Sequence, residues 1–317
     1  MTTKRFAAID IGTNTILAVI AELRRDGSFT VLDDLAEITR LGEGVDRSSL
    51  IGAAGEQRTR EVLRRYLDRC RNLGVDEIAV VGTSALRDAR NSAEVRARLK
   101  RELGVEVRVL SGTQEAAYAY LAVQRGLDLA AKDLLIIDIG GGSTEFVSAN
   151  ETGVYRSTSL DLGSVRLSER FLHSDPVRDE ERDAMVHAMD ESLTSLLGQW
   201  GLKAVALTVV GIAGTFTTLA AVEKRLARYS HSEVHGSHLT LAEVRRQVRL
   251  YQRLTVAERK TIPGLEPQRA DVILAGACLV ERIMTLLCVE QVIVSDQGVR
   301  YGLLHERLAS FSVDISV

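Results

Sequence analysis

Short apolar runs alternate along the chain with longer stretches that carry one apolar face. Runs of this kind predict buried strands, and the longer stretches predict amphipathic helices. The expected strands lie at 5–9, 16–23, 29–32, 77–81, 105–110, 133–137, 146–148, 154–159, 204–210 and 291–295. The expected helices lie at 48–73, 92–103, 111–120, 176–200, 241–254, 270–287 and 302–308, with one more after residue 215. Such alternation is typical of an α/β fold.

The order of elements restarts near the middle of the chain. An apolar strand leading into Asp-Ile-Gly, followed by small or hydroxylated residues and another strand, occurs at residue 10 and again at residue 138. Two copies one domain length apart indicate a duplicated α/β domain. We therefore expect domain I at 1–125 and domain II at 126–317, with a boundary near 121–132, a cleft between them, and a helix at about 300–317 that packs back on domain I.

Composition agrees with two soluble domains. The 317 residues include 45% hydrophobic and 26% charged positions, and the net charge is −3. A molecule with this charge does not attract a polyanion as a whole, so a phosphate-chain substrate would need locally concentrated positive charge. Nothing in the sequence resembles a helix-turn-helix, a zinc finger or a basic aromatic platform, and no nucleic acid partner is expected.

Three features bear on the compartment. Cys70, Cys278 and Cys288 form no CxxC pair, which favours a reduced cytoplasmic protein. The apolar run that starts at Phe6 is too short for a signal peptide. The uncharged stretch 204–222 is long enough to cross a bilayer, but its glycines favour a buried strand, a turn and a buried helix start. No membrane association is expected.

The two Asp-Ile-Gly turns carry the first candidate chemistry. Glycine lets the backbone approach a ligand closely, and successive N–H groups form a concave anion site. Hydroxyl and amide donors follow each turn. Asp10 and Asp138, at the strand ends, are candidate ligands for Mg²⁺, which needs only one or two carboxylates. The candidate phosphate-binding residues are Gly12, Thr13, Asn14, Thr15, Gly140, Gly141, Gly142, Ser143 and Thr144.

One such turn alone could be an ordinary tight turn with a structural aspartate. The second copy weakens that alternative. A third glycine turn follows the strand 204–210, as Gly211-Ile-Ala-Gly-Thr215, and adds Gly214 and Thr215 to the candidates.

These turns resemble the phosphate motifs of the actin, heat-shock-protein and sugar-kinase ATPase superfamily, whose domains are ribonuclease H-like. Within it, the chain resembles the exopolyphosphatase / guanosine pentaphosphate phosphohydrolase (Ppx/GppA) family, in its short two-domain form. The matching segments span nearly the whole chain, in order: AIDIGTNT at 8–15, GTSALRDARN at 82–91, LSGTQEA at 110–116, IDIGGGSTE at 137–145, LGSVRL at 162–167, GTFTTLA at 214–220 and RAD at 269–271.

The resemblance implies roles for individual positions. Glu115 falls at the family's catalytic glutamate, the base that activates water, and Arg87 at an arginine of the substrate cleft. Asp138 and Glu145 fall at acidic metal or catalytic positions. Judged without the resemblance, Glu115 is more simply a first-turn glutamate that the helix dipole favours. The resemblance also implies Mg²⁺ as cofactor and leaves open whether a monovalent cation such as K⁺ stimulates the enzyme.

Two clusters have simpler explanations. His231, His235 and His238 lie close together, but no cysteine or acidic cluster in the sequence completes a tetrahedral zinc set, and a metal site here is disfavoured. Val234-His-Gly236 resembles a family stretch and could line the cleft. The arginine-rich faces at 58–71, 96–101 and 245–249 are typical of solvated surfaces.

Three functions stay open at this level. The first is hydrolysis of a terminal phosphate, from inorganic polyphosphate or from guanosine pentaphosphate. The second is a kinase or ATPase of the same superfamily, which would need a purine pocket and an acceptor aspartate. The third is a sensor that binds such a ligand without turnover and signals by domain closure. The apolar helix 272–287 is either core or the face of a homodimer.

Overall fold

The structure is a computed structural model that describes residues 3–24, 26–127, 129, 133–201 and 207–313. It divides into two compact units. Unit 1 contains residues 1–125 and 297–317, and unit 2 contains residues 126–296. The chain thus leaves unit 1 once and returns to it at the end.

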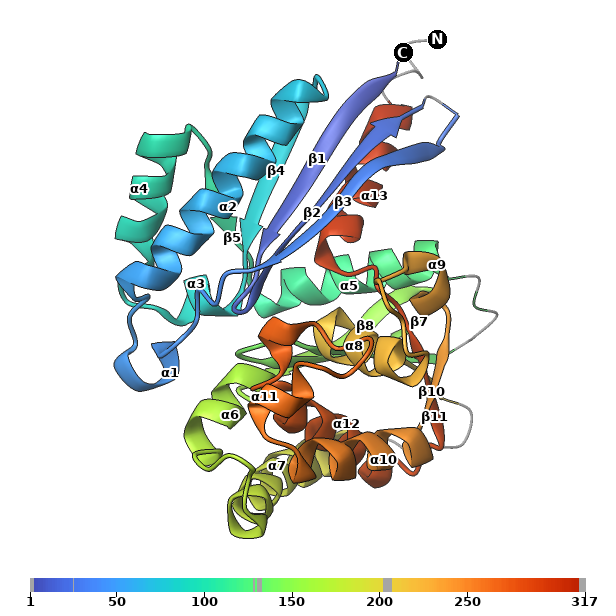
Figure 1. Ribbon diagram of the computed structural model, residues 1–317. Helices are drawn as coiled ribbons and strands as arrows, with labels where there is room; N and C mark the ends of the chain where they lie inside the picture. Colours follow the sequence, from blue (N-terminus) through green and yellow to red (C-terminus); the bar gives the residue numbers. More distant parts are fainter. Residues whose placement is uncertain (1–2, 25, 128, 130–132, 202–206, 314–317) are drawn as a thin grey trace. The chain divides into compact units, whose positions relative to one another are not determined.

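Unit 1 is built on a five-stranded sheet with the order β3-β2-β1-β4-β5 (Figure 1). The strands β1, β2 and β3 are antiparallel neighbours, whereas β4 and β5 run parallel to β1. The elements of unit 1 are β1 (Lys4–Ile11), β2 (Thr15–Leu23), β3 (Phe29–Ile38), α1 (Val45–Ser48), α2 (Ala53–Asn72), β4 (Glu77–Gly82), α3 (Ser84–Asp88), α4 (Ser92–Leu103), β5 (Val107–Val109), α5 (Gly112–Gly126) and α13 (Val299–Val313).

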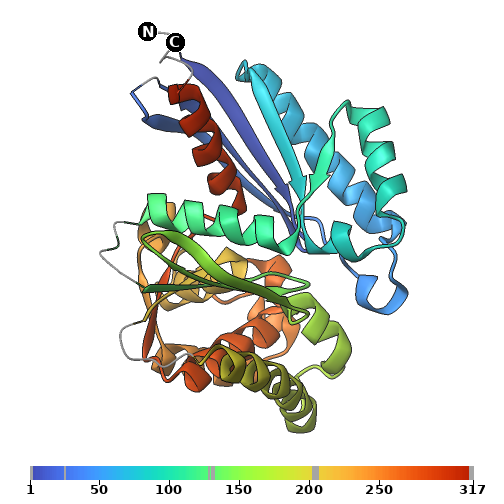
Figure 2. The ribbon, with the colours of Figure 1, turned by 180° about the vertical axis from the view of Figure 1, so that it is seen from behind.

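The two faces of this sheet pack against different helices. Ile9 and Ile11 share a buried cluster with residues of α2, whereas Phe6 and Ala8 share one with residues of α5 and α13. Figure 2 shows these helices on opposite faces. Because successive strand residues alternate between faces, Asp10 lies on the same face as α5 and α13.

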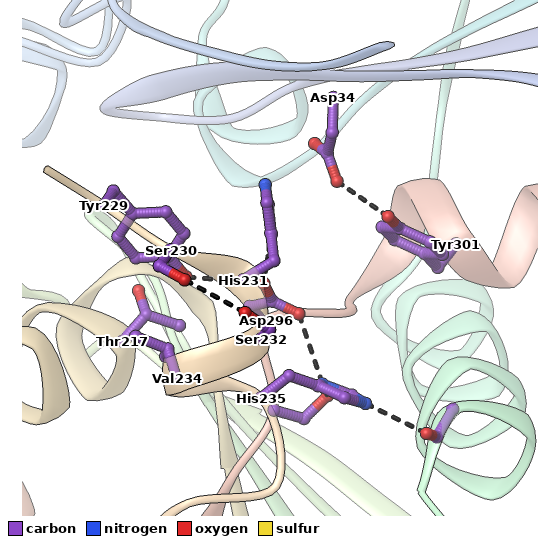
Figure 3. Close-up of polar contacts among 12 residues, drawn as sticks. Asp34, Thr217, Tyr229, Ser230, His231, Ser232, Val234, His235, Asp296 and Tyr301 are labelled. Carbon is purple, nitrogen blue, oxygen red and sulfur yellow. Dashed lines mark hydrogen bonds and ion pairs between the residues drawn. The ribbon is translucent and has the colours of Figure 1, made fainter. Parts of the chain in front are cut away.

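The last helix is anchored to the sheet by a buried ion pair. The Arg300 guanidinium donates to the Asp34 carboxylate of β3 with distances of 3.1 and 3.2 Å, and Tyr301 Oη donates to the same carboxylate at 2.7 Å. Figure 3 shows the bond between Asp34 and Tyr301. The helix also packs against β1 and β2. It is therefore part of the core of unit 1, although it comes last in the sequence.

Unit 2 has a six-stranded sheet with the order β10-β11-β9-β6-β7-β8. Its elements are β6 (Asp133–Ile139), β7 (Thr144–Asn150), β8 (Gly153–Leu160), α6 (Ser164–Phe171), α7 (Asp179–Trp200), β9 (Thr208–Ile212), α8 (Ala213–Glu223), α9 (His231–Val234), β10 (His238–Thr240), α10 (Leu241–Arg253), α11 (Val256–Arg259), a 3₁₀ turn (Pro267–Arg269), α12 (Ile273–Leu287) and β11 (Gln291–Val294). The large core of this unit lies between the sheet and the helices α7, α10 and α12.

The two sheets repeat one pattern. Three antiparallel strands, β3-β2-β1 or β8-β7-β6, continue into two parallel ones, β4-β5 or β9-β11, and unit 2 adds the antiparallel edge strand β10. This repeat confirms the α/β class and the duplication expected from the sequence.

The long elements agree with the sequence-based expectations, and the short ones differ. The expected helix 48–73 is two helices, α1 and α2, because Ser49 takes a left-handed conformation and Gly52 an extended one. The sequence pattern did not predict α3, α6, α9, β10 or α11, all of eight residues or fewer. Positions 204–206 of the expected strand lie outside the described residues. No described helix is long and apolar enough to span a membrane.

Candidate active site

The first phosphate loop connects β1 to β2 in unit 1. Gly12 N–H donates to the Thr15 carbonyl at 3.0 Å, which closes the turn. The Thr13 carbonyl accepts from Gly42 N–H at 2.9 Å, and the Asn14 carbonyl accepts from two further N–H groups, of residues 39 and 40, both at 3.0 Å. In a planar trans peptide the C=O and the next N–H point in opposite directions. The N–H groups of residues 14 and 15 therefore point away from segment 39–42.

Asn14 is the most informative side chain of this loop. It is only 6% exposed, and neither its Oδ1 nor its Nδ2 has a hydrogen-bond partner among the described residues. Buried polar groups are nearly always hydrogen-bonded, so an orphaned amide beside such a turn fits contact with a ligand. Asp10, at the end of β1, is also buried, with 8% of its surface exposed.

Glu115 lies in the first turn of α5 and is paired with Arg87 of α3. Arg87 Nη1 donates to Glu115 Oε2 at 3.1 Å and to the Leu110 carbonyl at 3.1 Å. The Glu115 side chain is 7% exposed and that of Arg87 is 28% exposed. The favourable helix dipole alone would explain neither the burial of this glutamate nor its pairing with a guanidinium. The guanidinium holds this carboxylate in a fixed position, as a general base requires.

The second phosphate loop, between β6 and β7 in unit 2, repeats the geometry of the first. Gly140 N–H donates to the Ser143 carbonyl at 3.0 Å, just as Gly12 donates to Thr15. The carbonyls of Gly140 and Gly141 accept from backbone N–H groups of the first turn of α6, at 2.9–3.1 Å. The Gly142 carbonyl accepts from Arg166 Nε at 2.7 Å.

Three successive carbonyls of this loop thus point toward α6. By the same peptide geometry, the N–H groups of residues 141, 142 and 143 point to the opposite side. Successive N–H groups on one side of a loop form an anion-binding nest. Gly163, directly before α6, must be a glycine, since a Cβ there would lie 2.2 Å from the Gly141 carbonyl oxygen.

Two acidic residues lie opposite each other beside the second loop. Asp138 of β6 and Glu145 of β7 are directly opposite in the antiparallel ladder. Opposite residues share one face of a sheet, and like charges there are unfavourable unless a cation or proton intervenes. Glu145 is buried and accepts hydrogen bonds at Oε1 from the hydroxyls of Ser143 and Ser159, both at 2.7 Å.

This pair is the arrangement that best fits a hard cation. Among the described residues no group of three His, Cys, Asp or Glu side chains is placed to hold a metal ion. Mg²⁺ commonly takes only one or two protein carboxylates and keeps several waters. In unit 1 the residue opposite Asp10 is Leu17, so the corresponding site there has a single carboxylate.

The hydroxyls of Thr144 and Thr215 serve the fold. Thr144 is fully buried and donates to the Leu162 carbonyl, and Thr215 Oγ1 donates to the Ile139 carbonyl at 3.3 Å. The second bond ties the third glycine turn to the end of β6. Both hydroxyl hydrogens are thus used within the protein, so the predicted substrate contacts of Thr144 and Thr215 would have to come from other atoms of these residues.

The third turn contacts an arginine that received no role from the sequence. A Cβ at Gly214 would lie 2.3–2.5 Å from the guanidinium of Arg269, so glycine is needed for this close approach. Burial lowers the pKa of Arg269. Arg166, which contacts the second loop, is another residue to which the sequence motifs assigned no role. Both belong to segments that matched the family, but nothing in the spacing alone distinguishes a loop-contacting arginine from a surface one.

The histidine cluster is an acid–histidine network (Figure 3). Asp296, which is buried, contacts His231 Nδ1 and lies 3.2 Å from His235 Nδ1. His235 Nε2 donates to the Gly126 carbonyl at 2.9 Å. Burial lowers the pKa of His235, but the bonds to Asp296 and Gly126 outweigh it, and the net shift is upward. His238 lies on β10 and is exposed.

Two of the three cysteines behave as structural thiols, and Cys288 is exposed. All three are free; Cys70 and Cys278 are buried, and burial raises their pKa values to about 11 and about 12. Thiols of this kind are unreactive at neutral pH. None of the three cysteines is among the residues of the candidate site.

Each unit thus brings together its own subset of the predicted residues. Unit 1 holds Asp10, the first loop, Arg87 and Glu115, and unit 2 holds the second and third loops with Asp138 and Glu145. The cleft that would join the two sets remains a prediction.

Comparison with known proteins places this geometry in context. The sequence model of the Ppx/GppA phosphatase family matches residues 19–311. A solved structure described as an exopolyphosphatase from Cytophaga hutchinsonii superposes with a TM-score of 0.88 at 27% identity, and covers 97% of this chain and 98% of its own.

Three curated relatives differ in length. Exopolyphosphatase 2 of Mycobacterium tuberculosis is 33% identical over 96% of this chain and 98% of its own length. A bifunctional 3-dehydroquinate synthase/phosphatase of Fusobacterium nucleatum is 30% identical over 95% of this chain, which spans only 46% of that protein. A guanosine-5'-triphosphate,3'-diphosphate pyrophosphatase of Vibrio vulnificus is 27% identical over 98% of this chain and 60% of its own length.

Proposed function

The chain belongs to the Ppx/GppA phosphatase family, and from that membership we propose that it releases terminal orthophosphate from inorganic polyphosphate in a Mg²⁺-dependent reaction. One observation carries the proposal most. The N–H groups of residues 141–143 are turned to one side of the second loop, next to the opposed carboxylates Asp138 and Glu145. An anion nest beside a cation site suits a phosphate chain with its bound metal.

The chain's own residues suggest how water attack would proceed. Glu115, held by Arg87, would accept a proton from the attacking water. The donors of the two loops, with the Asn14 amide, would bind and orient the phosphates. Phosphoryl transfer depends mainly on such positioning and on charge neutralisation. Mg²⁺ held by Asp138 and Glu145, with Asp10 as a further candidate ligand, would offset the charge that develops on the transferred group.

A second candidate substrate is guanosine pentaphosphate. The Vibrio vulnificus relative carries the name of a pyrophosphatase for this compound, whereas the relative matched over nearly its full length carries the name of an exopolyphosphatase. The length of the match therefore favours polyphosphate. The sensor alternative is weakened because Glu115, Asp138 and Glu145 are all present.

Phosphate release from four substrates tests the proposal. Short polyphosphate, long polyphosphate, guanosine pentaphosphate and ATP are compared side by side, with and without Mg²⁺, and with K⁺ or Na⁺ as the monovalent ion. The proposal expects Mg²⁺-dependent release that is fastest from polyphosphate. Turnover of the guanosine compound alone would establish the second candidate, turnover of ATP with transfer to an acceptor would favour a kinase, and binding without turnover would favour a sensor. Size measurement on the same sample tests whether the protein forms the homodimer that the sequence leaves open.

A further inference from the structure

We propose that Arg166 is a positioning residue for the second phosphate loop, and that it supplies positive charge beside the acidic pair. The inference rests on the proposed function, since it concerns how the same loop binds an anionic chain. It gives a role to an arginine that the sequence motifs contain but do not explain.

The first argument is the double contact of this residue with the loop. The backbone N–H of Arg166 donates to the Gly141 carbonyl at 3.1 Å, and its side-chain Nε donates to the Gly142 carbonyl at 2.7 Å. The second bond holds the peptide between residues 142 and 143, and so directs the Ser143 N–H to the opposite side of the loop. Without this donor, one of the three N–H groups of the nest loses its fixed direction.

The second argument is charge. The loop is followed by Glu145 and preceded by Asp138, so its immediate neighbours repel a polyanion. The Arg166 side chain is 17% exposed and touches the loop, whereas its acidic neighbour Asp161 is 82% exposed and 3.7 Å away. Ion pairs with exposed partners are weak and easily screened. The pair with Asp161 is therefore weak, and the positive charge of Arg166 lies directly against the loop.

A purely structural role would not need a guanidinium. The same loop is already held by three backbone N–H groups of α6 and by the buried Thr144 hydroxyl. A neutral donor would satisfy one more carbonyl, and burying an ionised group is costlier than burying an amide. What distinguishes the arginine from such a neutral donor is its positive charge, which lies beside the loop.

Two substitutions separate positioning from charge. Arg166→Gln removes both, and Arg166→Lys keeps the charge but removes the Nε donor. Arg170→Gln, an exposed arginine four residues later on α6, is the matched control. The readouts are KM and kcat on tripolyphosphate with Mg²⁺ at several salt concentrations, and calorimetric binding of tripolyphosphate to the intact protein without Mg²⁺. Circular dichroism verifies that each variant is folded.

We expect Arg166→Gln to raise KM and the dissociation constant about 10- to 100-fold, with a smaller change in kcat and a flatter dependence on salt. Arg166→Lys should keep the salt dependence of the parent protein while KM stays raised several-fold. If Arg166→Gln is unfolded, the lysine variant decides by the same criterion. If the parent protein is active and both Arg166 variants have KM and dissociation constants within about twofold of those of Arg170→Gln, this inference is overturned while the proposed function stands. A parent protein that neither binds nor hydrolyses tripolyphosphate would overturn the proposed function, and this inference with it.

Discussion

At the residue scale, Glu115 differs from an exposed first-turn acid in its burial and in its arginine partner. It is buried and receives a hydrogen bond from Arg87, whereas Glu94, in the first turn of α4, is exposed. The sequence placed Glu115 near a helix start, but the ion pair with Arg87 depends on a contact between residues 28 positions apart. No local pattern could reveal that contact, and the family resemblance pointed to the two residues separately, without predicting their pairing.

Replacement of Glu115 by Gln tests its role as base. The amide keeps the size and can still hydrogen-bond, but it cannot accept a proton from water at neutral pH. We expect kcat to fall about 10²- to 10⁴-fold while the affinity for tripolyphosphate changes little. Phosphate release and calorimetry provide the two measurements, and Glu94→Gln is the control. A near-normal rate in the Glu115 variant would refute the base assignment.

Asp138 is the residue at which metal binding can be tested most directly. Asp138 lies opposite Glu145 in the strand pair, and two acidic side chains on one face of a sheet favour a bound cation. Asp138→Asn removes one charge, so the Mg²⁺ concentration for half-maximal activity should rise at least about tenfold. Asp133→Asn, at the exposed start of the same strand, is the control. An unchanged Mg²⁺ titration would exclude Asp138 as a ligand.

At the element scale, the path between β8 and α6 allows no side chain at Gly163. A Cβ there would lie 2.2–2.4 Å from backbone atoms of residues 141 and 142, which cannot move without shifting the second loop. We expect Gly163→Ala to lower kcat/KM more than tenfold and to destabilise unit 2 by about 1–3 kcal/mol. Activity assays and urea unfolding would measure both effects.

The control for this substitution lies in the same unit. Gly198 is exposed in α7, and a Cβ there would meet nothing within 4 Å. Gly198→Ala should leave activity unchanged and raise the free energy of unfolding by up to about 1 kcal/mol, because alanine favours a helix. Equal behaviour of the two alanine variants would contradict the packing argument.

Local patterns predicted the long elements because their hydrophobic periodicity is sustained over many residues. They did not predict α6, although its first turn determines the direction of the loop N–H groups. Nor did they predict that Glu145 opposes Asp138, because the expected hairpin arm began only at residue 146. These features depend on strand register and on short turns, where few residues carry any signal.

At the scale of the whole molecule, the duplication is visible in the sequence, but the difference between its halves is not. Both units contain a turn closed by a glycine N–H and a carbonyl three residues later, yet Leu17 of unit 1 stands where unit 2 has Glu145. The opposed carboxylates therefore belong to unit 2 alone. The sequence-based domain boundaries, 1–125 and 126–317, remain a prediction.

The pH dependence of stability follows from His305 on α13. Its ring packs edge-on against Phe29, with ring centroids 5.5 Å apart, and its Nε2 has no hydrogen-bond partner among the described residues. Burial, with a smaller effect of Arg125, lowers its pKa from 6.5 to about 4. Above pH 6.5 the histidine is neutral in the folded and unfolded states. As the pH falls toward 4, only the unfolded state takes the proton, so this contribution to stability is lost, up to about 3 kcal/mol.

Substitution of His305 by Leu should remove this part of the acid sensitivity. The leucine keeps an apolar contact with Phe29 and has no group to protonate. We expect the difference in unfolding free energy between the variant and the parent protein to increase in favour of the variant from pH 7.5 to pH 4.5, as urea denaturation at several pH values would show. Carboxylates elsewhere titrate equally in both proteins and cancel in this difference. The control is His187→Gln, at an exposed position of α7, which should show no such trend. A constant difference for His305→Leu would mean that the folded protein accepts a proton at His305 as readily as the unfolded chain does.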